Sequence, residues 1–327
     1  MRLSQSEVLK IASAEGFDPP TLEKVLHLMN LLNMLNAHPY LKGKWILKGG
    51  TALNLFLLRM PRLSVDIDLN YVGALDREAM LDERPKIEQA VQAVCSREGF
   101  TVRRVPTEHA GGKWVLVYQS YAERTGNLEV DFNFMFRQPL WEPVVTDSIQ
   151  LGRYKANGIP VLDVHELTAG KLAALLARTQ VRDLFDCRQI FSTVKLNPKQ
   201  LRIGFVAYGG MNRKDWRTVS IDDINVDENE LAARLVPTLR DSTIPNGMSS
   251  REYGRELVDG CRRDLSVVLP LSGSELSFLD ALLEEGRIDA GLLTDDVELI
   301  RKVETHPLLA WKALNVRRHK GLDSGTE

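Results

Sequence analysis

The chain has 327 residues, of which 44% are hydrophobic and 26% charged, and its formal net charge is −2. These values are typical of globular proteins and exclude a disordered, fibrous or low-complexity chain. Neither half is strongly basic, so nucleic acid is a candidate partner only through a local patch. Three cysteines without metal-ligand spacing, no membrane-length apolar run and no signal-peptide core predict a cytoplasmic protein without a membrane partner.

The first part of the chain predicts a strand, a glycine turn and a helix in direct succession. Residues 3–38 carry apolar side chains at helical spacing. The short apolar segment 45–47 then runs through Gly49-Gly50-Thr51 into a predicted helix over 52–58. This order places free backbone amides at a helix N-terminus, where an anion can bind.

Two later segments alternate apolar and acidic residues, a pattern typical of strands with one polar face. The first places Asp66 and Asp68 on one face, and the second does the same for Glu129 and Asp131. Paired carboxylates repel each other unless they are solvated, protonated or bridged by a cation, and Mg²⁺ sites combine one or two carboxylates with substrate phosphates. A solvated strand edge is the other explanation. The sequence alone does not distinguish Glu129 from Asp131 as a third carboxylate.

The remaining pattern predicts an α+β domain followed by a helical one. Helices are expected at 76–98, 165–178 and 182–191, and strands at 100–105 and 114–118. The chain beyond Asn197-Pro198 is mostly helical in pattern. We therefore expect two domains, comprising residues 1–195 and 196–327.

The expected helix at 165–178 carries Lys171 and Arg178 on one face, between mostly apolar neighbours. Buried cations need partners, and phosphates are suitable ones, whereas snorkelling to solvent is the alternative. Asp183 and Asp186 follow near the start of the next helix, where capping explains one aspartate better than two.

Together, four segments resemble the DNA polymerase β-like nucleotidyltransferase superfamily and, within it, the AbiEii-type toxins of type IV toxin–antitoxin systems. These segments are Lys48-Gly49-Gly50-Thr51-Ala52-Leu53, Arg62-Leu63-Ser64-Val65-Asp66-Ile67-Asp68-Leu69, Lys171 with Arg178, and Arg182-Asp183-Leu184-Phe185-Asp186. The resemblance implies a core in which helices flank a mixed sheet, followed by a mostly helical C-terminal domain. The gap between Gly50 and Asp66 is longer than in the general polymerase β pattern, and it suits this branch.

The resemblance also implies a set of site residues. Asp66 and Asp68, with Asp131 as a further ligand, would hold Mg²⁺ or Mn²⁺, and Lys171 and Asp183 would complete the catalytic set. The nucleotide-binding positions would be Lys48, Gly49, Gly50, Thr51, Ser64, Arg178, Arg182 and Asp186.

The implied reaction is attack by an acceptor hydroxyl on the α-phosphate of an NTP, with pyrophosphate leaving. The expected acceptor is RNA, with the tRNA 3′ end as the leading case. The expected outcome is blocked translation and growth, neutralised by a cognate antitoxin protein. Transfer to a small molecule of the aminoglycoside type, AMP transfer to a protein, and a non-catalytic binding module are the alternatives. The presence of Asp66, Asp68, Lys171 and Asp183 together speaks against the last.

Two segments carry further expectations. Thr51 supplies the hydroxyl of the proposed phosphate cradle, so a negative charge there is expected to block NTP binding, which an antitoxin could exploit. The tail 306–320 is basic and contains Trp311. Contact with RNA and ordinary amphipathic packing both explain this composition.

Overall fold

The computed structural model describes residues 2–106 and 110–322, which fall into two compact units. Unit 1 takes its residues from 1–137, 143–162 and 232–250, and unit 2 takes them from 138–142, 163–231 and 251–327. This division differs from the boundary expected at 195/196. The helices after residue 163 group with the C-terminal helices, and a later segment returns to unit 1.

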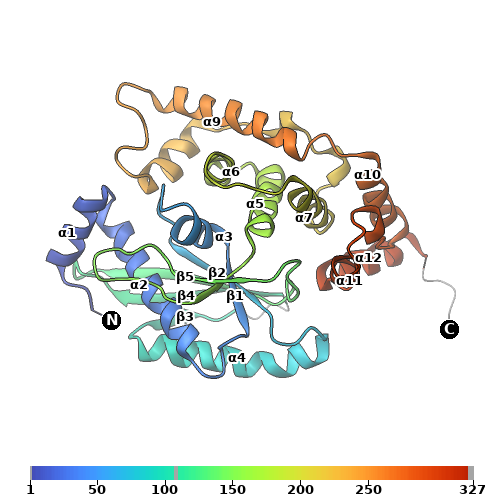
Figure 1. Ribbon diagram of the computed structural model, residues 1–327. Coiled ribbons are helices and arrows are strands. Elements are labelled where there is room, and N and C mark those ends of the chain that lie inside the picture. Colours follow the sequence, from blue (N-terminus) through green and yellow to red (C-terminus); the bar gives the residue numbers. More distant parts are fainter. Residues whose placement is uncertain (1, 107–109, 323–327) are drawn as a thin grey trace. The chain divides into compact units, whose positions relative to one another are not determined.

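Unit 1 is built on a mixed sheet whose described part has seven strands in the order β3-β4-β5-β2-β1-β7-β6 (Figure 1). The strands are β1 (Trp45–Lys48), β2 (Asp66–Tyr71), β3 (Thr101–Arg104), β4 (Gly111–Gln119), β5 (Thr125–Asn133), β6 (Val144–Thr146) and β7 (Ile159–Val161). β2 pairs in parallel with β5 and antiparallel with β1, while β7 joins β1 in parallel. This arrangement confirms the predicted α+β class.

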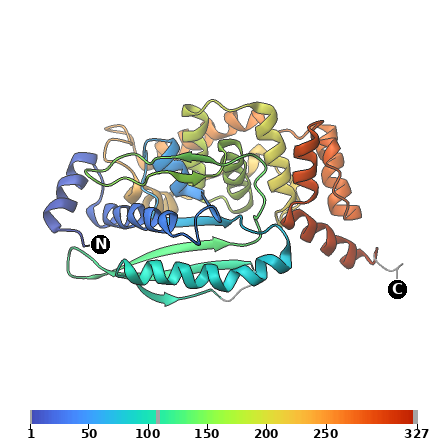
Figure 2. The same cartoon turned by 60° about the horizontal axis from the view of Figure 1, so that its bottom comes forward.

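Helices cover both faces of this sheet. They are α1 (Gln5–Glu15), α2 (Pro19–Ala37), α4 (Arg77–Arg97) and the short α3 (Gly49–Thr51), which continues as the π-helical turn η1 (Ala52–Leu57). α2 packs against α4 and β5, and α4 lies lengthwise along the sheet (Figure 2), whereas α3 lies on the opposite face (Figure 1). The start of α2 follows from its sequence, because Asp18 accepts a hydrogen bond from the Thr21 backbone N–H and Pro19 opens the first turn.

The strands β6 and β7 were not predicted. Each has three residues, too few to show an alternating pattern, and Pro160 interrupts the second. β7 nevertheless completes the sheet beside β1, because Leu47 pairs with Val161 and the Leu162 N–H donates to the Leu47 carbonyl at 3.0 Å. Tertiary pairing therefore decides the structure of these segments.

The returning segment 232–250, which includes the 3₁₀ turn Val236–Thr238, is held to unit 1 by backbone hydrogen bonds. The Leu63 N–H donates to the Thr238 carbonyl at 2.7 Å, and the Asp241 N–H donates to the Gly16 carbonyl at 2.9 Å. The chain entering β2 is thus fixed by residues about 175 positions further on in the sequence, which no local pattern predicts.

Unit 2 is mostly helical, as predicted for the later part of the chain. Its helices are α5 (Val164–Arg178), α6 (Val181–Thr193), α7 (Pro198–Gly210), α8 (Glu228–Glu230), α9 (Ser250–Asp264), α10 (Gly273–Asp280), α11 (Val297–Glu304) and α12 (Pro307–Lys320). α5 packs against both α6 and α7. Within residues 2–106 and 110–322, no helix combines the length and apolar character that a membrane crossing requires.

Unit 2 contains a buried glutamate on α5. Glu166 on α5 is 1% exposed, and its carboxylate accepts hydrogen bonds from the Leu140 backbone N–H and the Tyr208 hydroxyl, each at 2.9 Å. Burial raises the pKa of Glu166 to about 8, although the hydrogen bonds from Tyr208 and from the backbone of Trp141 and Leu140 act in the opposite direction. Glu166 is therefore mostly protonated at neutral pH.

This pKa predicts a pH-dependent stability. Between its ordinary pKa and about 8, the folded state keeps a proton that the unfolded chain has lost. The free energy of unfolding should therefore fall as pH rises through this range, by up to about 1.4 kcal/mol per pH unit, and level off above it. Glu166→Gln should remove this dependence in denaturant titrations. Glu142→Gln, at an 87% exposed side chain, is the control, and equal slopes in all three proteins would contradict the assignment.

Candidate active site

Two carboxylates of β2 lie on the same face of the sheet, as their spacing predicted. Asp66 and Asp68 are half-buried, whereas Ile67 and Leu69 between and after them are fully buried. Since successive strand residues point to opposite faces, the aspartates share the face on which α3 lies. We call the acidic residues on this side of β2 and β5 the carboxylate face; it comprises Asp66, Asp68, Glu129 and Asp131.

The register between β2 and β5 brings the second pair of carboxylates next to the first. Asp66 is paired with Glu129, and Asp68 with Asp131. Residues that are paired across neighbouring strands point to the same side, with Cβ atoms about 5 Å apart. Four carboxylates therefore gather on one patch of the sheet, and their mutual repulsion favours a bound cation.

Two lysines flank this patch, and they interact differently with Glu129 and Asp131, the two candidates for a third carboxylate ligand. Lys113 on β4 binds Glu129 at 2.6 Å. Lys48 on β1 is the residue opposite Asp68 in the strand register. Burial lowers the pKa of the Lys48 ammonium, although attraction to Asp68 and Asp131 acts against this shift. Within the described part of the chain, Asp131 forms no ion pair or hydrogen bond through its carboxylate, so it is better placed than Glu129 to take a further ligand.

The glycine turn Gly49-Gly50 lies directly against these carboxylates. Gly49 has a φ of +74°, and a Cβ atom there would collide with the Asp68 carboxylate. A Cβ at Gly50 would lie 2.7 Å from Ser64 Oγ and 3.0 Å from Arg62 Nη2. The left-handed backbone of Gly49 and the close contacts of both glycines bring the start of α3 and its backbone N–H groups next to the carboxylate face.

Thr51 is placed differently from our expectation. Its side chain is fully buried, and its hydroxyl donates a 2.5 Å hydrogen bond to the backbone carbonyl of Asp66. The hydroxyl therefore ties α3 to β2. What Thr51 adds to the proposed cradle is its backbone N–H at the helix start.

One residue of the second motif has a role that the sequence did not reveal. Arg62 is 2% exposed, and its guanidinium donates to the Leu63 carbonyl at 2.8 Å while it lies against Gly50. The Arg62 guanidinium therefore supports the glycine turn at Gly50. The available signal was its place at the start of the segment that leads to Ser64 and Asp66.

The predicted cationic residues form a second cluster, in unit 2. Lys171 Nζ lies 2.8 Å from Asp183 Oδ1 and 2.9 Å from Asp186 Oδ2, and Arg178 Nε lies 2.9 Å from Asp183 Oδ2. The two aspartates are almost fully buried, whereas the Arg178 side chain is 54% exposed. We call these four residues the lysine cluster.

The lysine cluster links α5 to α6 through compensated charges. Burial by itself would raise the pKa of Asp183, but Lys171 and Arg178 hold it below its ordinary value. Arg182 lies in the first turn of α6 and is half-buried. The two aspartates therefore fix the position of the Lys171 ammonium.

The carboxylate face has the ligands that a hard divalent cation prefers, although it does not enclose one. Among the residues that the structure describes, no group of three or more histidine, cysteine, aspartate or glutamate side chains is arranged to hold a metal ion. Two carboxylate ligands completed by substrate phosphates are a typical Mg²⁺ arrangement. The geometry therefore fits a metal that binds together with a nucleotide.

The sequence matches a known family over most of its length. The profile of the nucleotidyl transferase AbiEii toxin family of type IV toxin–antitoxin systems matches residues 30–248, about two thirds of the chain. The chain belongs to the AbiEii family. The family predicted from the four motifs is thereby confirmed: this is a nucleotidyltransferase toxin of a type IV toxin–antitoxin system.

A comparison with solved structures extends the likeness to nearly the whole chain. The chain is similar to MenT4, a nucleotidyltransferase toxin from Mycobacterium tuberculosis H37Rv, with a TM-score of 0.58 and 20% sequence identity. The alignment covers 95% of this chain and 99% of MenT4. At this identity the likeness concerns the fold, and it confirms the predicted fold class. Among curated protein sequences, no match is found.

The contact between Gly49 and Asp68 predicts a site-specific effect of an added methyl group. Gly49→Ala should lower nucleotide transfer by about 10²-fold or more, because it displaces a carboxylate by a large fraction of an ångström. Gly43→Ala is a matched control, since Gly43 has a φ of +76° and a Cβ placed there would have no atom within 4 Å. Both variants should lose roughly 1 kcal/mol of stability from the left-handed backbone. Equal activity in the two would contradict the packing role.

Proposed function

We propose that this AbiEii-family toxin transfers nucleotides from an NTP to the hydroxyl of an RNA acceptor, with the tRNA 3′ end as the leading candidate, and that a cognate antitoxin protein neutralises it. One observation carries the proposal: the glycine turn packs on Asp68 so closely that an anion at the start of α3 would also adjoin the carboxylate face. A triphosphate with a divalent cation matches this combination of amides and carboxylates.

In our proposal, different residues of unit 1 bind the metal ion and the phosphates. Asp66 and Asp68, with Asp131 as the third ligand, would hold Mg²⁺ or Mn²⁺, which supplies neutralisation of charge on the phosphates. The amides of Gly49, Gly50 and Thr51 would bind the terminal phosphates, and Ser64 and Lys48 would border them. The Arg62 guanidinium, which lies against Gly50, supports the turn. These assignments follow the positions of the residues on β1, α3, β2 and β5.

The residues of unit 2 supply the positive charge that the reaction needs. In our proposal Lys171 stabilises the negative charge that develops as pyrophosphate leaves, and Arg178 and Arg182 assist in binding the nucleotide. Asp183 and Asp186 hold the Lys171 ammonium at 2.8 and 2.9 Å, which fixes its position before the substrate arrives. Preorganised charge of this kind needs no rearrangement during the reaction.

The acceptor is tested directly by incubating the purified full chain with each labelled NTP, Mg²⁺ and total RNA, followed by gel electrophoresis. Label in a tRNA-sized band supports the proposal. Label in an acid-soluble product identifies a small-molecule acceptor instead, and label in the protein band identifies AMP transfer to a protein. Either of these results would overturn the proposed acceptor and leave the nucleotidyltransferase chemistry in place.

The carboxylate face predicts an ordered set of losses. Asp66→Asn and Asp68→Asn should each reduce transfer by at least about 10³-fold, and Asp131→Asn by roughly 10²-fold, because each removes a charged ligand. Glu129→Gln is the matched control, because Glu129 already pairs with Lys113 and should stay near wild-type activity. Growth inhibition on expression should follow the same order. Full activity of Asp68→Asn, or equal losses at the Asp131 and Glu129 positions, would contradict these assignments.

The lysine cluster predicts a loss of both activity and stability at Lys171. Lys171→Ala should lower turnover by roughly 10²–10³-fold, with a much smaller effect on NTP affinity. It should also lower the free energy of unfolding by about 3–5 kcal/mol, because two buried aspartates lose their ion pairs with the Lys171 ammonium. Arg178→Gln, at an exposed side chain, should cost at most about 1 kcal/mol. If the folded fraction of Lys171→Ala keeps full turnover, Lys171 is structural only.

A further inference from the structure

A shallow groove of about 500 Å³ in unit 2 is lined by one large aromatic side chain and several basic ones. Trp311 on α12 is 54% exposed, which is a large exposure for this residue type. The charged or titratable lining residues among those described are all basic: Arg213, Lys312, His319 and Lys320. The chain as a whole has a net charge of −2, so a surface that combines tryptophan with basic groups alone differs from the average composition of the chain.

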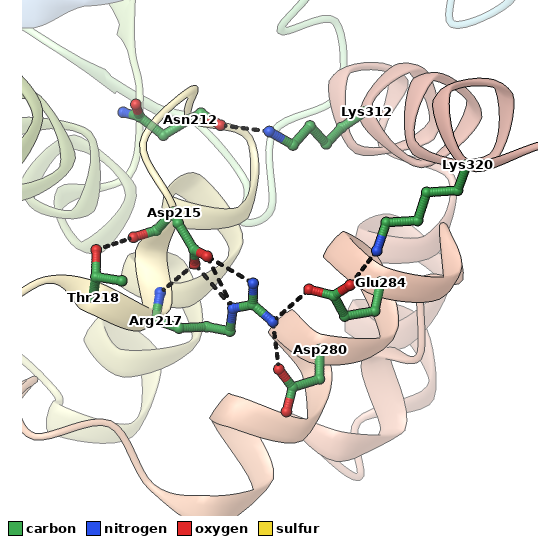
Figure 3. A network of polar contacts seen from close by, with 8 residues as sticks. All are labelled: Asn212, Asp215, Arg217, Thr218, Asp280, Glu284, Lys312 and Lys320. Atoms are coloured by element: carbon green, nitrogen blue, oxygen red, sulfur yellow. Dashed lines mark hydrogen bonds and ion pairs between the residues drawn. The ribbon is translucent and has the colours of Figure 1, made fainter.

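The neighbouring carboxylates are engaged by an arginine that does not line the groove. Figure 3 shows Arg217 pairing with three of them, Asp215, Asp280 and Glu284, at 2.6, 2.8 and 2.9 Å. Glu284 also binds Lys320. Most of the acidic charge near the groove is therefore directed toward Arg217, and Lys320 shares Glu284 with it. Arg213 and Lys312 are the lining cations best placed to meet a ligand.

The basic lining residues have different local partners. Lys312 Nζ donates to the Asn212 carbonyl at 2.9 Å, as Figure 3 shows, and burial lowers the pKa of Lys312, although Asp215 acts against this shift. Arg213 is exposed, and no carboxylate in the described ranges pairs with it. Within the described ranges neither cation is paired with a carboxylate, so both can form charge-assisted hydrogen bonds with a phosphate.

Apolar surface makes up the larger share of the lining, but its area is small beside that of a protein–protein interface. This surface consists of Met211, Leu283 and Val316 beside the indole of Trp311, with Asn315 as a neutral polar neighbour. A protein partner of ordinary affinity requires a larger apolar centre. An aromatic plane flanked by cations and an amide instead matches the chemistry of an unpaired nucleotide, whose base stacks while its phosphates bind the cations.

We propose that this groove binds a single-stranded segment of an RNA, with a base stacked on Trp311 and the adjoining phosphates bound by Arg213 and Lys312. The proposal rests on the proposed function, in which RNA is the acceptor. It adds a second contact for that acceptor, made by residues other than those assigned to catalysis. The exposed Trp311 then has a function in recognition.

The test measures binding of a fluorescein-labelled ten-nucleotide single-stranded RNA to the full chain by fluorescence anisotropy, without NTP. Trp311→Leu keeps an apolar side chain but loses the aromatic plane, and it should weaken binding at least about 5-fold, the lower limit for one stacked base. Trp311→Phe should recover most of the affinity. Arg213→Gln should lower the slope of log affinity against log salt concentration by about 0.7, the value for one phosphate contact on a single strand.

The matched control is Arg255→Gln, at an exposed arginine of α9 that does not line the groove. It should leave both affinity and salt slope at the wild-type values. The groove assignment is overturned if Trp311→Leu and Arg213→Gln bind the RNA as the wild type does, or if Arg255→Gln weakens binding equally. A wild-type chain that binds no single-stranded RNA overturns it as well.

Failure of this inference is distinguishable from failure of the proposed function. If the wild type transfers nucleotides to RNA and the groove variants bind RNA normally, the acceptor is right and the groove is wrong. If the wild type transfers no nucleotide to RNA, and Trp311→Leu nevertheless weakens RNA binding, the groove assignment holds and the proposed acceptor reaction fails.

Discussion

The close packing of the glycine turn on Asp68 is the constraint on which the site in unit 1 depends. Antiparallel pairing of β1 with β2 sets Lys48 opposite Asp68, so the chain must leave the sheet at the next residue, beside that carboxylate. A side chain at Gly49 would collide with Asp68, and one at Gly50 would press on Ser64 and Arg62. The amides that begin α3 are therefore brought next to the carboxylates, and both features of a nucleotide–metal site come from one turn.

Charge is organised across the sheet by the same register. Along one row the residues are Lys48, Asp68, Asp131 and Lys113, from β1 through β2 and β5 to β4. Two acidic residues lie in the middle and a lysine lies at each end. Such a row limits the repulsion between the carboxylates in the absence of a cation, and it leaves them able to bind one. Lys113 binds Glu129, its diagonal neighbour on β5. Of the two acidic residues of β5, Glu129 is therefore neutralised and Asp131 is available.

Local patterns predicted the elements that follow a strict period, and they missed features that depend on distant pairing. Alternation was sufficient to place Asp66 with Asp68, and Glu129 with Asp131, on common faces. It did not give the register between the two strands, which decides that Asp131 lies opposite Asp68. Segments of three residues, such as β6, carry no period at all, and the attachment of 232–250 to unit 1 depends on contacts between residues that are remote in the sequence, such as the Arg240–Glu15 ion pair. Motif order, in contrast, was specific enough to predict the family.

The position of Thr51 shows why a motif residue and a ligand-contacting residue are different things. The sequence placed its hydroxyl beside two glycines that bind phosphate in our proposal, but the hydroxyl instead closes a 2.5 Å hydrogen bond to the Asp66 carbonyl in a fully buried position. A charge introduced there would break this tie and would need burial without a partner, which costs several kcal/mol. Loss of NTP binding in a Thr51→Glu variant would then report displacement of Asp66, not direct competition with a phosphate. An antitoxin that covers the carboxylate face avoids that cost, whereas one that modifies Thr51 must first open the contact between α3 and β2.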